Sequence, residues 1–260
     1  MEIASKTDVG IERKQNQDQV GIFYNQDQLP ILLLCDGMGG HNAGDVASEM
    51  AIFHVGHAWE ETTGMDDPAM IQEWIQANVQ SANAKIYEKA NQYQDLAGMG
   101  TTIVAAVALE DLNQVILAHI GDSRIYMVKA GQIQQMTRDH SFVQELVDMA
   151  MITKEEAATH PQKNIVTRAV GIDPEVATDV DILDFNPGDI LLMCSDGLTD
   201  MVAEDQVLAI LAREYLGVAE KADTLIAKAN ENGGRDNVSV LIAQRDFNQD
   251  DYINERGDQA

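Results

Sequence analysis

The sequence predicts an α+β fold, in which a core rich in strands is accompanied by amphipathic helices. Short apolar runs end repeatedly at Gly or Asp turns, which is typical of buried strands. At least one long segment has the 3.6-residue apolar period of a helix. Strand hairpins outnumber alternations of strand and helix, which argues against a doubly wound parallel sheet.

The predicted strands are the apolar runs that turn residues bound on both sides. They cover residues 31–35, 101–109, 115–120, 190–194 and 238–243. Residues 125–128 and 132–136 flank the dipeptide Ala130-Gly131, so we expect them to pair as a β-hairpin.

The clearest predicted helix begins at Pro68, because Asp67 is placed to cap it and proline is favoured at the first helical position. Its apolar stripe consists of Ile71, Trp74, Ile75, Val79, Ala82, Ile86 and Ala90. Further helices are predicted over 44–59, over 204–216 with Gly217 as the stop, and over 219–231 with Gly233-Gly234 as the stop.

The chain of 260 residues is long enough for one large domain, which we place at residues 1–245. A mixed segment over 141–171 contains a capping box that starts at Thr153, so it is predicted to be a small helical insertion. Residues 246–260 are acidic and poor in apolar side chains, and this composition predicts a mobile tail.

Acidic residues dominate the charge, since 43 Asp and Glu against 17 Lys and Arg give a net charge of -26. Such a field repels nucleic acid and anionic membranes, so neither is expected as a partner. No apolar run is long enough to insert into a membrane, and the N-terminus has no export signal, which together predict a cytoplasmic protein. The two cysteines are expected to be buried free thiols, and a monomer is the default expectation.

Four aspartates stand where a predicted strand meets a turn: Asp36, Asp122, Asp196 and Asp236. An isolated Asp-Gly turn is common in proteins, but four such positions in one chain point to a shared site. Carboxylates gathered from separate strands repel one another unless a cation lies between them. Oxygen ligands without His or Cys favour Mg²⁺ or Mn²⁺ over Zn²⁺.

Carboxylates that hold two such ions are typical of hydrolases of phosphate esters. A water bridging the ions loses a proton near neutral pH, and the ions offset the charge that develops on the phosphoryl group. Arg13 is the best candidate to hold the phosphate, because a guanidinium can bind two phosphate oxygens. The alternative is a surface arginine that pairs with Glu12 or Asp18.

Nine motifs in order resemble the metal-dependent protein phosphatase family, the type-2C Ser/Thr phosphatases, and in particular its stand-alone bacterial members. They are TDVG at 7–10, Arg13 with Asn16 and Asp18, DGMGGH at 36–41, GMGTT at 98–102, HIGDSR at 119–124, TRDHS at 137–141, HPQKN at 160–164, SDGLTD at 195–200 and GGRDNVSV at 233–240. The resemblance implies a four-layer α/β/β/α sandwich of two antiparallel sheets flanked by helices. In that fold, residues 141–171 would be a flap that selects substrates beside the metals.

The resemblance also implies a ligand set for two Mn²⁺ or Mg²⁺ ions and for a third, weaker one. Asp36 would bridge the two ions, with the Gly37 carbonyl on one and with Asp196 and Asp236 on the other. Asp18 would act through water, and Asp122 together with Asp196 would hold the third ion. The implied reaction is hydrolysis of phosphoserine and phosphothreonine in proteins, by attack of a water or hydroxide that bridges the two ions. The implied partners are phosphoproteins and an opposing bacterial Ser/Thr kinase.

Two departures from the family pattern affect the mechanism. Gln17 stands where many members carry Glu, so the water network around the second metal depends more on Asp18. Met38 stands where eukaryotic members carry a His that acts as general acid. His41 is then the candidate to protonate the leaving group. Two alternatives stay open: His41 only hydrogen-bonds its loop, or a metal-bound water is the acid.

Three rival functions make different demands on the sequence. A cysteine-dependent phosphatase would need Arg six positions after the nucleophile, but His41 and Asp200 stand at those positions. A binding module without turnover would be expected to lack one of Asp36, Asp196 and Asp236, and all three are present. A nuclease with the same two-metal chemistry would need a basic groove, which a chain of this charge does not readily supply.

Overall fold

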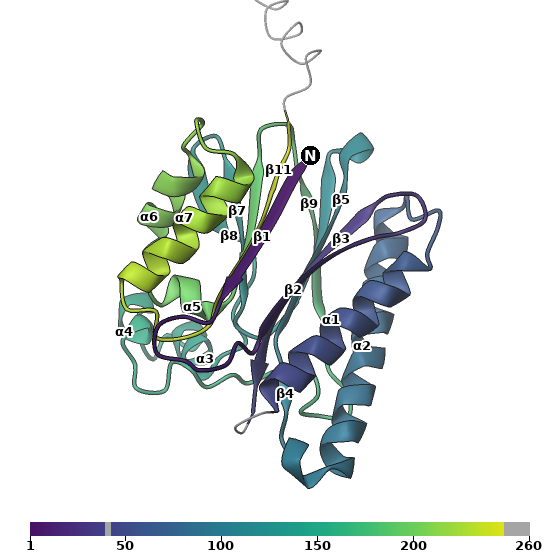
Figure 1. The fold of residues 1–260 in the computed structure, drawn as a ribbon, viewed down its shortest axis with the longest axis vertical. Coiled ribbons are helices and arrows are strands. Elements are labelled where there is room, and N and C mark those ends of the chain that lie inside the picture. Colours follow the sequence, from purple (N-terminus) through teal and green to yellow (C-terminus); the bar gives the residue numbers. More distant parts are fainter. Residues whose placement is uncertain (40–42, 247–260) are drawn as a thin grey trace, which may run out of the picture.

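The computed structural model describes residues 1–39 and 43–246, and its core is built from two antiparallel β-sheets packed face to face (Figure 1). The first sheet has the spatial order β1 (Glu2–Asp8), β11 (Val238–Gln244), β10 (Ile190–Cys194), β7 (Arg124–Lys129) and β8 (Gln132–Gln135). The second has the order β2 (Asp18–Tyr24), β3 (Pro30–Met38), β5 (Ile103–Leu109), β6 (Gln114–Ile120) and β9 (Asp179–Asp184), and the short β4 (Gly100–Thr101) also pairs with β3.

Helices cover the outer face of each sheet. The long helices α1 (Gly44–Glu60) and α2 (Pro68–Gln92) pack on the second sheet. The first sheet is covered by α5 (Asp196–Thr199), α6 (Glu204–Leu211) and α7 (Val218–Glu231). Two short 3₁₀ helices, η1 (Gln94–Leu96) and η2 (Glu110–Leu112), lie in the connections.

Three hydrophobic clusters fill the spaces between these four layers. The central cluster joins the two sheets, with Leu32 and Leu34 from β3 facing Leu191, Met193 and Leu241 from the opposite sheet. One outer cluster lies between the second sheet and α1 and α2, and the other lies between the first sheet and the C-terminal helices. Because each strand alternates its side chains between two faces, strands buried on both faces read as continuous apolar runs. The predicted α/β/β/α sandwich is confirmed.

The sequence signals at the ends of elements act as expected in several places. Asp67 caps α2 by accepting a hydrogen bond from the Ala69 N–H at 2.8 Å, and Pro68 is the first helical residue. The hairpin of β7 and β8 turns at Ala130 and Gly131, which both have positive φ, as a type I′ turn requires. The helix predicted over 219–231 is α7, and the following glycines end it.

Two predicted boundaries are wrong. The strand predicted over 101–109 is interrupted at Thr102, because the Thr102 hydroxyl, in place of a main-chain carbonyl, accepts the Asp36 N–H. The helix predicted over 204–216 ends at Leu211. Tight turns follow it, and Gly217 caps the start of α7 with its N–H on the Glu220 carboxylate.

Three strands, β1, β2 and β9, have no counterpart among the predicted elements. Each is the outermost strand on its side of a sheet, and most of its side chains are only partly buried or exposed. Edge strands bury fewer side chains than central strands, so their apolar pattern is weaker. Neighbouring strands therefore decide their conformation more than their own sequence does.

The segment predicted as a helical insertion contains α3 (Phe142–Asp148) and α4 (Lys154–Ala158). The expected capping box is present, since the Thr153 hydroxyl accepts from the Glu156 N–H and the Glu156 carboxylate accepts from the Thr153 N–H. We use the name flap for residues 141–171. At its stem, the Phe142 N–H donates to the Ile165 carbonyl and the Thr167 N–H donates to the His140 carbonyl.

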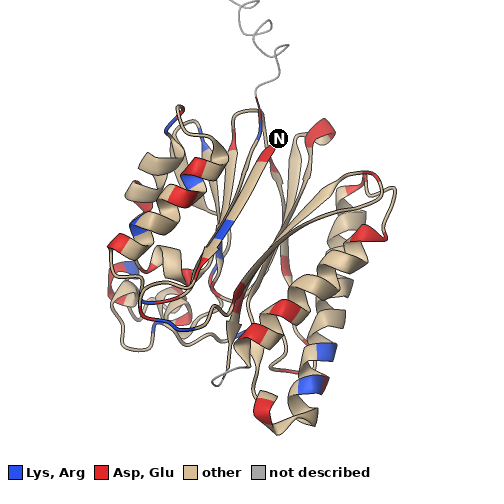
Figure 2. Cartoon of the chain, in the orientation of Figure 1, with Lys and Arg blue, Asp and Glu red and all other residues tan. Residues whose placement is uncertain are grey.

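Acidic residues are distributed over both helical layers and several strand ends (Figure 2). Cys35 and Cys194 are buried and unpaired, as expected. Among the described residues, no helix combines the length and the apolar character needed to cross a membrane.

Candidate functional site

The two sheets bring the predicted aspartates to one edge of the sandwich, near β4 and α5 in Figure 1. Asp36 lies near the end of β3, directly opposite Asp18 on β2. The other aspartates lie at chain reversals: Asp122 after β6, Asp196 as the first residue of α5, and Asp236 before β11. A cavity of about 310 Å³ is lined by Asp36, Asp122, Asp196 and Asp236 together with Gly37 and Arg13. Asp18 is buried and does not line the cavity.

Gly37 lies where the main chain passes closest to helix α1. A Cβ atom on Gly37 would lie 2.0 Å from the Gly44 carbonyl oxygen, so no other residue fits without moving the helix. The Gly37 N–H donates to the Gln17 carbonyl, which also accepts the Ser48 hydroxyl at 2.6 Å. The main chain of Gln17 therefore holds this part of the site, and its side chain lines the cavity.

Burial and mutual repulsion both raise the carboxylate pKa values. Burial raises the pKa of Asp36 well above its usual value, and the negative charges of Asp18, Asp196, Asp122 and Asp236 raise it further. The pKa of Asp196 is raised well above its usual value, first by burial and then by Asp122 and Asp236. Burial is also the main cause that raises the pKa values of Asp18 and Asp122 to about 6.

Two buried carboxylate oxygens have no hydrogen-bond partner in the described residues: Oδ1 of Asp18 and Oδ1 of Asp196. The other oxygen of Asp18 accepts the Ser195 hydroxyl at 2.7 Å. An unpartnered buried acceptor normally costs about 1–3 kcal/mol, and more when it is charged. A cation among these carboxylates would satisfy the oxygens and remove the repulsion, so the donor set fits hard divalent ions.

Arg13 is half exposed and donates a hydrogen bond from Nη2 to Oδ2 of Asp236 at 2.7 Å. It therefore lies at the cavity and does not pair with Glu12 or Asp18. The loop that carries Arg13 is held by Asn237, whose side-chain amide donates to the carbonyls of Val9 and Gln15. The side-chain oxygen Oδ1 of Asn237 accepts the Gln17 N–H at 2.8 Å.

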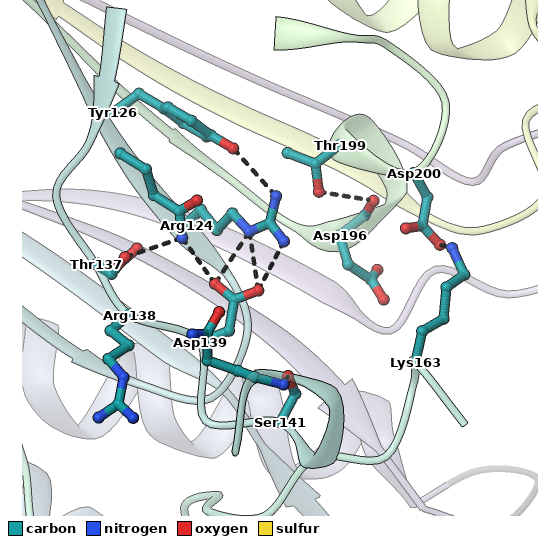
Figure 3. A network of polar contacts seen from close by, with 12 residues as sticks. Arg124, Tyr126, Thr137, Arg138, Asp139, Ser141, Lys163, Asp196, Thr199 and Asp200 are labelled. Carbon is teal, nitrogen blue, oxygen red and sulfur yellow. Dashed lines mark hydrogen bonds and ion pairs between the residues drawn. The ribbon is translucent and has the colours of Figure 1, made fainter. Parts of the chain in front are cut away.

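A second cavity of about 390 Å³ lies under the flap and shares Asp122, Asp196 and Asn164 with the first. Figure 3 shows the Asp196 carboxylate between two ion pairs. In one pair, Arg124 binds both oxygens of Asp139, at 2.7–3.0 Å. In the other, Lys163 of the flap binds Asp200 at 2.5 Å. The space beside the aspartates is thus walled partly by the flap.

A group of His119, His140 and Asp179 also lies beside the flap, with one potential ligand atom from each within 4.8 Å of the others. His41, the predicted general acid, lies outside the described residues, so its role stays a prediction. Sequence reasoning did not assign roles to Thr102, Ser195 and Asn237, which hold the aspartates and the Arg13 loop. Each lies inside a motif, but its hydrogen-bond partner comes from a distant part of the chain.

Comparisons with known proteins agree with this geometry. The sequence model of the family described as protein phosphatase 2C matches residues 11–231. A serine/threonine phosphatase, stp, of Listeria monocytogenes is 45% identical over 244 residues, which are 94% of this chain and 96% of that protein. Protein phosphatase PhpP of Streptococcus pneumoniae is 40% identical over 96% of this chain and 99% of its own length.

Solved structures show the same likeness in three dimensions. A serine/threonine phosphatase of S. agalactiae superimposes with a TM-score of 0.89 at 40% identity, covering 94% of this chain and 99% of that chain. The serine/threonine phosphatase PstP/Ppp of Mycobacterium tuberculosis has a TM-score of 0.84 at 38% identity, covering 95% of this chain and 99% of that chain.

Proposed function

The chain belongs to the protein phosphatase 2C family and is a serine/threonine phosphatase of this type, and we propose that it works with two divalent cations held by its clustered aspartates. The observation that carries the proposal is the cluster of carboxylates at one sheet edge, with two unpartnered oxygens and with the pKa values of Asp36 and Asp196 raised by burial first and by mutual repulsion second. When bound, Mn²⁺ or Mg²⁺ supplies a water activated for attack and offsets charge on the phosphoryl group.

Each carboxylate has a distinct part in this proposal. Asp36 lies centrally, since four other aspartates act on its charge, and it would bridge the two ions with the Gly37 carbonyl beside it. Asp196 and Asp236 would complete the coordination of one of these ions. Asp18, opposite Asp36 in the sheet, would contact the metal through a water molecule, and its Oδ1 would orient that water. Asp122 and Asp196 share the wall between the two cavities, and they would hold a third, weaker ion.

Arg13 would bind the phosphate of the phosphoserine or phosphothreonine. Its guanidinium is half exposed at the cavity and is held at one nitrogen by Asp236, which leaves further N–H groups for phosphate oxygens. Protonation of the leaving alkoxide by His41 remains part of the proposal. From the resemblance to stand-alone bacterial members, we further propose that the enzyme opposes a bacterial Ser/Thr kinase. The proposal keeps the cytoplasm as its location and a monomer as the default state.

The first experiment measures phosphate release from a phosphothreonine peptide by the full chain with Mn²⁺, with Mg²⁺ and with a chelator. We expect activity with at least one metal and a loss of at least about 10³-fold with the chelator, because the metals contribute several kcal/mol to the rate. Activity that persists in chelator would contradict the metal-dependent mechanism. Mn²⁺ binding without any turnover would favour a module that only binds phosphoproteins.

Replacing Arg13 tests the phosphate-binding role. For Arg13→Ala we expect KM for the phosphopeptide to rise by about 10–100-fold, because a charge-assisted pair contributes roughly 1.5–3 kcal/mol. Arg13→Lys should reverse only part of the rise in KM, since an ammonium group lacks the planar pair of N–H donors with which a guanidinium binds two oxygens. The matched control is Arg235→Ala, which removes a neighbouring exposed arginine that does not line the cavity. Equal KM values for Arg13→Ala and wild type would exclude the role.

A further inference from the structure

On one side, His140 holds the turn that carries Asp122 by two hydrogen bonds. The Nδ1 atom of His140 accepts the Gly121 N–H at 3.0 Å, and the His140 N–H donates to the Gly121 carbonyl at 2.9 Å. On the other side, Gly121 has a φ of +106°, and a Cβ there would lie 2.5 Å from the Cγ2 atom of Thr102. The main chain immediately before Asp122 is therefore fixed on both sides.

The orientation of the His140 ring is fixed by a second set of contacts. Its Nε2 atom lies 3.2 Å from Oδ2 of Asp179, so the N–H at Nε2 donates to that carboxylate and Nδ1 stays free to accept from Gly121. Asp179 is itself held by Arg168 at 2.6 Å. The His119 ring stacks on the His140 ring with 4.7 Å between the ring centroids. The Nε2–H of His119 donates a hydrogen bond to the Arg138 carbonyl.

These contacts assign a hydrogen-bonding role to the group of His119, His140 and Asp179. Both ring nitrogens of His140 are occupied, one by a main-chain N–H and one by a carboxylate. A metal ion at this group would have to displace the bond to Asp179 and the bond from His119 to Arg138. Burial and the neighbouring His119 also lower the pKa of His140, which favours the neutral ring that this pattern needs.

His140 also begins the stem of the flap. Its carbonyl accepts the Thr167 N–H at 2.8 Å from the segment that returns from the flap. Arg168, the next residue of that segment, donates a hydrogen bond to the same Asp179 that holds the His140 ring. The two sides of the flap stem and the Asp122 turn are thus joined through one carboxylate.

We propose that His140 is a positioning residue, which sets the affinity of the Asp122 carboxylate for its cation and couples this affinity to the flap stem. The inference rests on the proposed third ion at Asp122 and Asp196. Groups that orient a metal ligand typically change metal affinity by 10–100-fold when they are replaced. A small shift of the Gly121 main chain would move Asp122 within the wall that the two cavities share.

The test is calorimetric titration of the metal-free full chain with Mn²⁺, which measures the affinity of the weak site without any turnover. For His140→Ala we expect the weak-site affinity to fall by about 10–100-fold, with the tighter sites changed less than about twofold. His140→Asn, whose Oδ1 can accept the Gly121 N–H, should restore a large part of the affinity. If His140→Ala does not fold, Asp179→Ala takes its place, with an expected loss of about tenfold.

The matched control is Asn83→Ala. Asn83 is fully buried and holds the far end of the flap through the Gly171 N–H at 2.6 Å, without contact to Gly121. It should lower thermal stability to a similar degree and leave the weak-site affinity within about twofold. An unchanged weak site in the folded His140→Ala protein would overturn the inference. So would equal losses in His140→Asn, His140→Ala and Asn83→Ala, because they would indicate only general loosening.

Asp122→Asn separates this inference from the function on which it rests. We expect this variant to lose the weak site and to keep the two tighter ones. If Asp122→Asn binds Mn²⁺ as wild type does, the third site is not at Asp122, and the role of His140 is overturned together with it. If Asp122→Asn loses the site and His140→Ala does not, only the role of His140 is overturned.

Discussion

Asp36→Asn is expected to lower kcat/KM for a phosphothreonine peptide by at least about 10³-fold at saturating Mn²⁺. The substitution keeps the size of the side chain and removes the charge that would bridge two ions. Several kcal/mol of transition-state stabilisation depend on those ions, and each 1.36 kcal/mol is a factor of ten in rate. Calorimetry should show that the two tighter Mn²⁺ sites are lost or strongly weakened.

The control for this prediction is Asp181→Asn, which makes the same chemical change at an exposed carboxylate on β9. It should leave kcat/KM within about twofold of wild type, since isolated surface charges contribute little. Asp36→Asn with activity close to wild type, in a protein that binds Mn²⁺ normally, would contradict the central place of Asp36.

The metal-free protein is expected to be more stable at pH 5 than at pH 7.5. Asp18 and Asp122 have folded pKa values of about 6, well above the usual 3.8, and those of Asp36 and Asp196 are raised as well. The folded state therefore binds more protons than the unfolded state over this range. The stabilisation is complete below about pH 4 and is lost as pH rises through the folded pKa values. Thermal melts in chelator measure the effect.

Asp18→Asn separates this local effect from the general repulsion of a chain with net charge -26. A shift of about two pKa units at a buried carboxylate corresponds to about 3 kcal/mol, so the metal-free variant should gain stability of that order at pH 7.5. The gain should shrink at pH 5, where Asp18 in the folded wild type is largely protonated. Identical pH profiles for variant and wild type would contradict the assignment to Asp18.

Added Mn²⁺ should reverse the trend, because ligands must lose their protons to bind the ion. The melting temperature at pH 7.5 should therefore rise with Mn²⁺ by more than it does at pH 5. At a thousandfold excess over the dissociation constant, the stabilisation would be about 4 kcal/mol. A melting temperature that is independent of Mn²⁺ at both pH values would show that the aspartates do not hold the ion.

Local patterns in the sequence were sufficient for the central strands, the long helix α2, the hairpin at Ala130-Gly131 and the positions of the strand-end aspartates. Each of these depends on residues close together in the chain: an apolar period, a cap such as Asp67, or a turn such as Ala130-Gly131. The order of the motifs then indicated the family, and with it the four layers and the ligand set.

Contacts between distant residues were decided only by the tertiary structure. The edge strands β1, β2 and β9 take their conformation from their neighbours, and α6 ends at Leu211, before Gly217, which caps the start of the next helix. Asp18 receives the hydroxyl of Ser195, 177 residues away, and Arg13 pairs with Asp236 across 223 residues. No local pattern encodes such pairs, because burial and charge repulsion at the site arise only when the two sheets have packed together.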